Sequence, residues 1–258
     1  MAGSGNRGKQ ARQERIVAEL RAQPALRVHE LAALFDVSTE TVRRDLEELD
    51  RSKRLHRTYG GASALPYMNE PTLNERSQVL VEERTRIGRA AARLVGLNEV
   101  VFIDSGSTTL ACAQRLSADS RAMTAITTSV PIAALLAANP AIHVIVCPGD
   151  YDPRDGSLYG THTVEFIRRF NATHVFFGAS GLATEGPSDA NPAAVAIKQA
   201  MIERAALATL LVDHSKYERA ALERICALKS IDRIVCDEAL PEEIEILARK
   251  HSIEIVIE

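Results

Sequence analysis

The stretch Val37-Ser38-Thr39-Glu40-Thr41-Val42-Arg43-Arg44-Asp45-Leu46 contains the signal that decides the fold of the first part of this chain. Apolar residues recur through it and just beyond it at i, i+4 and i+7, namely at Val42, Leu46 and Leu49. This spacing is typical of the buried face of an α-helix, and the helical period then turns Arg43 and Arg44 outward. The stretch therefore predicts an amphipathic helix that presents two adjacent arginines to solvent.

Two shorter amphipathic helices are predicted before this one. Their apolar positions are Ile16, Val17 and Leu20 in the first helix and Leu31, Leu34 and Phe35 in the second. Ser38 stands at the N-cap position of the third helix, where its hydroxyl can accept a bond from a backbone N–H, although Thr41 replaces the acid of a full capping box. Two short helices, a tight turn and a capped third helix predict a helix-turn-helix, a fold that places its last helix in the DNA major groove.

The segment Arg57-Thr58-Tyr59-Gly60-Gly61 follows about ten residues later and predicts a β-wing, because it mixes strand formers with a cation and then turns on two glycines. A solvated helix face would also explain the arginine pair alone, but the wing favours nucleic-acid binding. The predicted contacts to double-stranded DNA are Ser38, Thr39, Thr41, Arg43, Arg44, Arg57, Tyr59 and Gly60.

The composition is that of a globular protein, with 46% hydrophobic and 25% charged residues. Residues 1–61 contain 12 basic against 9 acidic residues, whereas the remainder contains 19 against 25, so a mildly basic head precedes an acidic body.

The four cysteines and seven histidines show no metal-ligand spacing, so no metal and no cofactor are expected. No signal peptide or membrane span is evident, which predicts a cytoplasmic protein, and residues 1–11 are expected to be a disordered basic arm.

After the head, whose predicted extent is 12–62, residues 63–83 have the Pro and Asn content of a linker. From residue 84 to 258, short β-branched runs alternate with helical patterns. The strands are expected at 100–103, 125–128, 143–147, 174–177, 210–212, 233–236 and 253–257, and the helices at 84–95, 132–138, 163–170, 193–207 and 242–250. This alternation predicts an α/β domain with a mainly parallel sheet, in which ligands bind beyond the carboxyl ends of the strands.

Small and polar residues follow several of these predicted strands. Asp104-Ser105-Gly106-Ser107-Thr108-Thr109 comes first, and it precedes a helix expected to begin at Leu110, so backbone N–H groups and hydroxyls would face a phosphate. A capped turn without a ligand explains that segment equally well on its own. Further strand ends contribute Ser129, Gly149, Gly181, Asp213 and Lys216. Together these residues predict a site for a small phosphorylated, polyhydroxylated effector.

The combination of these motifs resembles the DeoR family of bacterial sugar-metabolism regulators, from about Arg12 to Asp237. The resemblance implies a winged-helix head, a sensor domain related in fold to ribose-5-phosphate isomerase, a phosphorylated sugar as effector, and a homo-oligomer, either dimer or tetramer. The chain departs from the family pattern at Ser129, where Asn is common, at Pro148-Gly149-Asp150, which replaces a Gly-Gly turn, and at Ala194, where Glu is usual.

The leading hypothesis is a DNA-binding repressor of a sugar or polyol catabolic operon, controlled by a phosphorylated sugar and without enzymatic activity. An alternative is a sugar-phosphate isomerase fused to a DNA-binding head, with Asp104 or Asp213 as base and Lys216 as electrostatic partner. Ala194 removes one candidate carboxylate and weakens that alternative. A nucleoid protein without an effector is weakened by the acidic body.

Overall fold

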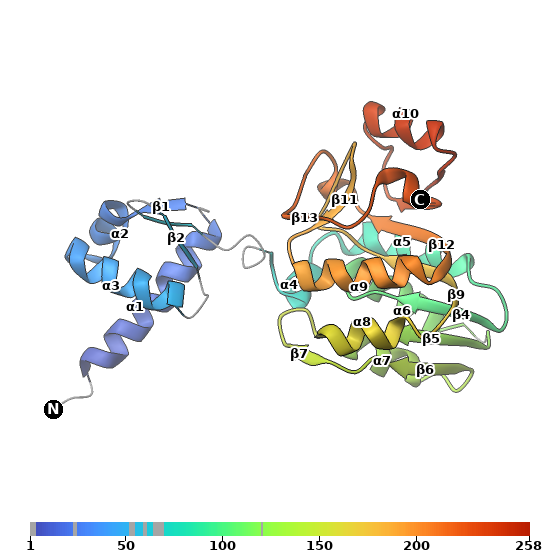
Figure 1. The fold of residues 1–258 in the computed structure, drawn as a ribbon, viewed down its shortest axis with the longest axis horizontal. Coiled ribbons are helices and arrows are strands. Elements are labelled where there is room, and N and C mark those ends of the chain that lie inside the picture. Colours follow the sequence, from blue (N-terminus) through green and yellow to red (C-terminus); the bar gives the residue numbers. More distant parts are fainter. Residues whose placement is uncertain (1–3, 23–24, 52–54, 59–60, 64–69, 120) are drawn as a thin grey trace. The chain divides into compact units, whose positions relative to one another are not determined.

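The computed structural model describes residues 4–22, 25–51, 55–58, 61–63, 70–119 and 121–258. The chain forms two compact units, Met1–Glu70 and Pro71–Glu258 (Figure 1). Buried hydrophobic side chains form one cluster in the first unit and two in the second. No helix in the described ranges combines the length and the apolarity needed to cross a membrane.

The first unit is the predicted helix-turn-helix with a small antiparallel sheet. Its elements are α1 (Ser4–Ala22), β1 (Ala25–Arg27), α2 (Val28–Phe35), α3 (Thr39–Arg51), β2 (His56–Thr58) and β3 (Gly61–Ser63). The strand order is β1-β3-β2, and β2 with β3 forms the predicted wing. Ile16, Leu31, Val42, Leu46 and Leu49 are buried together, so the apolar periodicity identified the core that packs the three helices.

Two predictions for this unit are wrong, and one strand was not predicted. Residues 4–11 are helical rather than a disordered arm, because α1 extends over α3 and ion pairs join Lys9 to Glu48 and Arg12 to Asp45. Leu34, expected in the buried stripe of α2, is 49% exposed. Strand β1 was not predicted, since its three residues pair with β3, far away in the sequence, and carry no local strand pattern of their own.

The second unit is an α/β domain built around a parallel sheet (Figure 1). Its helices are α4 (Leu73–Ser77), α5 (Val81–Arg93), α6 (Ser107–Ser117), α7 (Val130–Ala137), α8 (Thr161–Ile167), α9 (Pro192–Glu203), η2 (His214–Lys216), η3 (Leu228–Ser230) and α10 (Glu242–Lys250). Its strands are β4 (Glu99–Ile103), β5 (Met123–Thr127), β6 (Ile142–Val146), β7 (Asp150–Asp152), β8 (Ser157–Tyr159), β9 (Ala172–Phe177), β10 (Gly181–Ala183), β11 (Gly186–Asp189), β12 (Ala205–Val212), β13 (Glu223–Arg224), β14 (Arg233–Cys236) and β15 (Glu254–Ile257).

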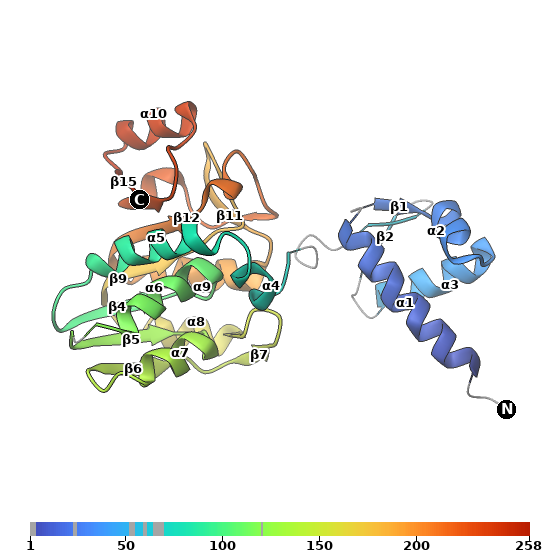
Figure 2. The ribbon, with the colours of Figure 1, turned by 180° about the vertical axis from the view of Figure 1, so that it is seen from behind.

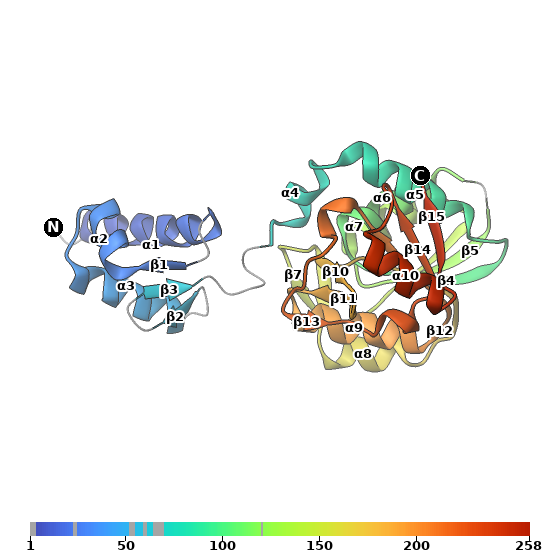
Figure 3. The same cartoon turned by 90° about the horizontal axis from the view of Figure 1, so that it is seen from above.

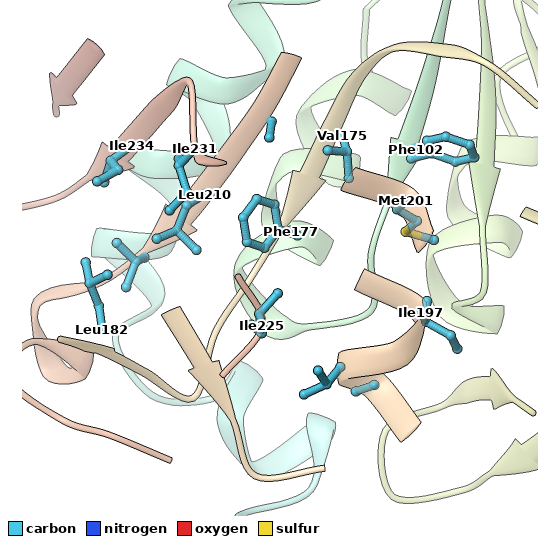
Figure 4. Close-up of a cluster of buried hydrophobic side chains, with 14 of the residues drawn as sticks. Phe102, Val175, Phe177, Leu182, Ile197, Met201, Leu210, Ile225, Ile231 and Ile234 are labelled. Carbon is cyan, nitrogen blue, oxygen red and sulfur yellow. The ribbon is translucent and has the colours of Figure 1, made fainter. Parts of the chain in front are cut away.

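Among the described residues, seven strands form the main sheet in the order β15-β14-β12-β9-β4-β5-β6, and every neighbouring pair is parallel. Helices α8 and α9 cover one face (Figure 1), and α5, α6 and α7 cover the other (Figure 2). Successive side chains of β4 alternate between the two faces. Phe102 lies in one cluster with Val175, Phe177 and Met201 of α9 (Figure 4), whereas Val101 and Ile103 pack against α5 and α6. Burial on both faces explains why these strands are continuous apolar runs.

Most of the predicted effector residues follow strands that end at one edge of the sheet. Strands β4, β5, β9 and β12 all finish on the same side of the sheet because they are parallel. Figure 3 views the unit from above and shows α4, β7, β10 and β11 on one side of it. The small sheet β10-β11-β13 and the hairpin β7-β8 were not predicted, because each pairs segments of only two to four residues.

Several predicted boundaries need correction. The expected linker 63–83 contains α4 and the start of α5, and the second unit begins at Pro71. Thr72 and Glu75 form a reciprocal capping box there, and Leu73 is buried, so a segment with linker-like composition folds onto the domain. The helix expected at 193–207 ends at Glu203, because β12 already begins at Ala205, and the helix expected from Leu110 begins at Ser107.

Candidate DNA-binding surface and effector site

Helix α3 presents the predicted arginines to solvent. The side chains of Arg43 and Arg44 are 55% and 75% exposed. Both lie near the carboxylate of Glu40, at nitrogen–oxygen distances of 3.8 Å for Arg43 and 3.4 Å for Arg44. Exposed pairs of this kind are weak, so both guanidinium groups can exchange Glu40 for phosphate or base edges.

Ser38 begins the helix as predicted. Its hydroxyl oxygen accepts the backbone N–H of Thr41 at 3.1 Å and lies 2.8 Å from the Thr41 hydroxyl. Thr39 is the exposed first residue of α3. Arg57 lies on β2 of the wing, whereas Tyr59 and Gly60 fall outside the described residues. Contacts of these residues with DNA remain a prediction.

Asp45 is a structural residue of this unit that the sequence analysis missed. It is buried on α3, where its carboxylate bonds to the Arg12 side chain at 2.6 Å and to the Gln13 amide at 3.2 Å. The sequence did indicate its burial, because Asp45 lies three residues after the buried Val42 and next to the buried Leu46, on the inward side of the helix. Its partner could not be identified, because α1 lies more than thirty residues earlier in the chain.

A buried charge cluster lies at the carboxyl edge of the sheet. Asp104 directly follows β4 and is almost fully buried. The Lys198 ammonium of α9 lies 2.7 Å from the Asp104 carboxylate and 3.2 Å from that of Asp189, which ends β11. The backbone N–H of Gly178 also donates to Asp104, at 3.3 Å. Neither Lys198 nor Asp189 was predicted, although a lysine three residues after Val195 and three before Met201 marks a charge on a buried helix face.

The charges of this cluster are strongly coupled. Burial alone would lower the pKa of Lys198, but the carboxylates of Asp104 and Asp189 raise it above its ordinary value, so the ammonium stays charged. Burial raises the pKa of Asp104, and Lys198 opposes that shift. The result is a buried ammonium held between two carboxyl groups. The ammonium can donate hydrogen bonds to the hydroxyls of a ligand, and the carboxylates can accept them.

The segment after Asp104 forms the first turn of α6. Gly106 is the N-cap and Ser107, Thr108 and Thr109 are the first helical residues, so the predicted phosphate loop lies at a helix N-terminus. Because the N-cap residue Gly106 has no side chain, it forms no capping hydrogen bond to the first turn of α6. The Thr109 hydroxyl donates to the Gly106 carbonyl at 3.0 Å. The backbone N–H groups of this turn are therefore not occupied by a capping side chain.

Asp213 and Lys216 follow β12, which is separated from β4 by β9 in the sheet. Asp213 is buried, and its carboxylate bonds to the Arg84 guanidinium of α5 at 3.0 Å and to the backbone N–H of Ser215 at 3.2 Å. Burial would raise the pKa of Asp213, but bonds from Ser215 and Arg84 hold it below its ordinary value. Lys216 is half-buried at the end of η2. Arg84 was not predicted, because it anchors a helix that the sequence places in a different part of the domain.

Three predicted effector residues have local structural roles. Ser129 is fully buried and caps α7 through the N–H of Ile132 at 3.4 Å. A Cβ at Gly149 would lie 2.6 Å from the Tyr159 carbonyl, and a Cβ at Gly181 would collide with the Arg219 backbone, so both positions require glycine for close approach. Gly149 also lines an open depression of about 660 Å³, together with Pro148, Asp150, His162, Glu165, Phe166 and Arg169. Their role as ligand contacts stays a prediction.

One group in the described ranges has metal-ligand character. The ligand atoms of His214, Asp237 and Glu238 lie within 4.8 Å of one another. His214 Nδ1 is 2.6 Å from the Asp237 carboxylate and 3.5 Å from that of Glu238. The bond to Asp237 raises the pKa of His214, and a hydrogen-bonded histidine–aspartate pair accounts for this geometry.

Comparison with known proteins identifies both units. Residues 12–66 match the model of the DeoR-like helix-turn-helix domain, and residues 80–238 match that of the DeoR C-terminal sensor domain. The glycerol-3-phosphate regulon repressor of Escherichia coli K12 is 30% identical over 93% of this chain and 95% of its own length. The HTH-type transcriptional repressor GlcR of Bacillus subtilis is 28% identical over 95% of this chain and 96% of its own length.

Among solved structures, ribose-5-phosphate isomerase A of Methanocaldococcus jannaschii has a TM-score of 0.41 and 16% identity, covering 54% of this chain and 55% of that chain. The matched ranges agree with the extent of the resemblance inferred from the sequence motifs. Close relatives along the full length are regulators, so the isomerase alternative is not adopted and the chain is a regulator rather than an enzyme. The chain belongs to the DeoR family of DNA-binding transcriptional regulators.

Proposed function

We propose that this regulator represses a sugar or polyol catabolic operon and that a phosphorylated sugar bound by the second unit controls its binding to DNA. The observation that carries this proposal is the Asp104–Lys198–Asp189 cluster beside the open N-terminus of α6. A phosphate favours the backbone N–H groups of a helix N-terminus, and sugar hydroxyls favour paired carboxylates and an ammonium.

The basic residues near this site differ in whether a carboxylate already binds them, and this difference supports separate roles for them. Lys198 is engaged by two carboxylates and Arg84 by Asp213. Lys216 makes no ion pair within 4.0 Å among the residues that the structure describes, and it lies near the same edge. We therefore assign the phosphoryl group to Ser105–Thr109 and Lys216, and the hydroxyl groups to the buried cluster.

The relatives support the same class of effector. One is named for a glycerol-3-phosphate regulon, that is, for a phosphorylated polyol. Binding to an operator would use α3 and the wing of two copies, since helix-turn-helix dimers read two half-sites related by a twofold axis. A homo-oligomer, dimer or tetramer, is therefore part of the proposal.

The first experiment selects binding sites for the full chain from a random duplex library and then titrates the selected DNA by fluorescence anisotropy. Replacing both Arg43 and Arg44 by Ala should weaken binding by roughly 1–3 kcal/mol for each base edge that an arginine reads. Unchanged affinity in the double variant would exclude α3 as the reading helix.

The second experiment repeats the titration with glycerol 3-phosphate, ribose 5-phosphate, glucose 6-phosphate and the corresponding unphosphorylated compounds. A phosphorylated compound should shift the affinity for DNA, its unphosphorylated partner should not, and Lys216→Ala should weaken the response. Exposed Lys229 provides the matched control, Lys229→Ala. If the phosphorylated and unphosphorylated compounds act alike, or if neither acts, the proposed effector class is wrong.

A further inference from the structure

The two strands at the edges of the main sheet differ in charge. Among the residues that the structure describes, β15 and β6 are the terminal strands of this sheet. Strand β15 carries Glu254, which is paired with Arg233 at 2.6 Å, and Glu258 follows the strand. Charged side chains on an edge strand disfavour its pairing with another chain. The β15 edge is therefore protected against association.

Strand β6 has no such protection. Its sequence is Ile142-His143-Val144-Ile145-Val146, which contains no Asp, Glu, Lys or Arg. Val146 is 45% exposed and His143 is exposed as well. In the described part of the chain, β6 pairs with β5 on its inner side and with no strand on its outer side. The backbone groups of that outer side are available to a further strand.

Helix α7 lies beside β6 and is apolar on both of its sides (Figure 2). Ile132 and Leu136 are buried in the core on one side. The residues exposed on the other side lie at i, i+4, i+7 and i+8 and form one helix face, namely Val130, Ala134, Ala137 and Ala138. A helix on a protein surface ordinarily has polar or charged residues on this face. The outer face of α7 therefore has the composition of a covered surface.

The absence of charge extends through both elements. Residues 122–149 contain no Asp, Glu, Lys or Arg, although these four types make up 25% of the chain. A segment of 28 residues with that composition would carry about seven charged side chains. Helix α10 shows the ordinary pattern, because its exposed Ile246 shares the helix with the exposed Glu243 and Arg249. The α7–β6 surface, defined by the exposed face of α7 and the outer edge of β6, is thus distinct from the other apolar positions of the unit.

A surface without charge suits a second copy of the same chain. Both copies use the same patch in an interface with twofold symmetry, so a side chain near the axis lies close to its own counterpart. A charged residue there would repel that counterpart, whereas valine and alanine do not. The small side chains of Ala134 and Ala137 also let two helices approach closely, since the distance between packed helices depends on the side chains at the contact.

The geometry of the sheet allows both elements to take part at once. Two antiparallel strands of one sheet are related by a twofold axis perpendicular to that sheet, which leaves each face of the sheet on its own side. Pairing β6 of two copies in this way would place both α7 helices on the same face of a continuous sheet. The edge strand and the helix beside it would then form one interface.

We propose that the α7–β6 surface joins two copies of the chain, with β6 paired antiparallel to β6 of the other copy and α7 packed against α7. This inference rests on the proposed function, which includes a homo-oligomer, and it identifies the surface that holds the copies together. The contact has the twofold symmetry that reading two half-sites of an operator requires.

The test measures the assembly of the full chain by analytical ultracentrifugation over a range of concentrations. Ala134→Glu places a charge in the middle of the exposed face of α7, and Val146→Lys places one on the edge strand. Each should raise the dissociation constant of one assembly step at least about 10-fold, because like charges meet across the axis and an edge lysine opposes strand pairing. Circular dichroism of each variant checks that it is folded.

Two further variants make the result specific. Ile246→Glu adds the same charge on α10, where the replaced side chain is 57% exposed, and it should assemble as the wild type does. Ala134→Lys should weaken assembly as Ala134→Glu does. Mixing these two variants should restore assembly, because opposite charges then face each other across the axis. A variant that had lost its fold would not be restored by mixing.

The outcomes separate this inference from the proposed function. If the wild-type chain is a monomer at every concentration, the homo-oligomer of the proposed function and this surface are both wrong. If the chain assembles but the variants at Ala134 and Val146 dissociate no more readily than Ile246→Glu, the surface is wrong and the oligomer stands. Failure of the mixed variants to assemble would likewise overturn the twofold contact through α7.

Discussion

At the scale of single residues, the most consequential side chain of the second unit is Lys198, a buried cation between two carboxylates. Replacing it by methionine keeps the length of the side chain but leaves Asp104 and Asp189 without their counter-ion. Removing one partner from a buried pair costs about 3–5 kcal/mol. We expect Lys198→Met to lower the free energy of unfolding of the second unit by this amount in urea denaturation at neutral pH.

The control for this variant is an exposed ion pair of the same unit. Arg168 and Glu203 lie 3.2 Å apart with both side chains more than half exposed. Arg168→Ala should change the free energy of unfolding by less than about 1 kcal/mol, since exposed pairs contribute little. A Lys198→Met variant no less stable than Arg168→Ala would show that the cluster is not held together by its charges.

Two histidines should make opposite contributions to the pH dependence of stability. His174 is buried at the start of β9, and burial lowers its pKa below the ordinary 6.5, although Glu99 at 3.3 Å opposes the shift. Below pH 6.5 the unfolded chain then binds more protons at His174 than the folded chain does. Stability should therefore fall as the pH drops through this region, and His174→Gln should reduce the slope.

His214 should affect the pH dependence of stability in the opposite direction. Its bond to Asp237 raises the pKa of His214 above 6.5, so the folded chain holds this proton more tightly than the unfolded chain. The stabilisation is complete below pH 6.5 and is lost as the pH rises through the raised pKa. Urea denaturation of His214→Gln across pH should remove a decline above 6.5, whereas a variant with the wild-type slope on that side would contradict the assignment.

At the scale of elements, we expect Glu40 of α3 to weaken the binding of this helix to DNA. Glu40 lies near Arg43 and Arg44 and would also repel DNA phosphates. We expect Glu40→Gln to strengthen binding to the selected DNA by about 1 kcal/mol at low salt, because it frees both arginines and removes a like charge. Fluorescence anisotropy at several salt concentrations measures the effect.

The matched control makes the same charge change elsewhere on α3. Glu48 faces α1, where it bonds to Lys9 and Gln13. Glu48→Gln should leave DNA affinity much closer to wild type than Glu40→Gln does. Equal gains in the two variants would indicate a general effect of net charge rather than release of Arg43 and Arg44.

Elements with a strong local pattern were predictable from the sequence. Helix α3 and the strands of the parallel sheet follow from apolar spacing, and so does the position of Asp104 at the carboxyl end of β4. The partners of buried charges were not predictable. Lys198 joins Asp104, and Arg84 joins Asp213, only after distant segments have packed. Helix α4 was missed because its capping residues and single buried leucine resemble a polar linker.

At the scale of the whole molecule, the chain divides into two units with separate hydrophobic cores and different charge. The first core lies within residues 16–55 and the other clusters begin at Ile87. The basic residues outnumber the acidic ones in 1–61, and the reverse holds in the remainder. Each unit can therefore unfold as its own cooperative transition and can be stabilised by its own ligand.

Calorimetry of the full chain should accordingly resolve two transitions that respond to different ligands. A phosphorylated sugar at a hundred times its dissociation constant stabilises the unit that binds it by about 2.7 kcal/mol, or roughly 5–10 °C for a domain of this size. The selected DNA should raise the other transition. In the Arg43 and Arg44 double variant, the sugar phosphate should still raise its transition temperature, whereas the DNA should no longer raise the other. In Lys216→Ala, the DNA should still raise its transition temperature, whereas the sugar phosphate should not. A sugar phosphate that raised the transition of residues 1–70 as much as that of residues 71–258 would contradict this separation, because it would place the ligand at the DNA-binding unit or make the chain a single cooperative body.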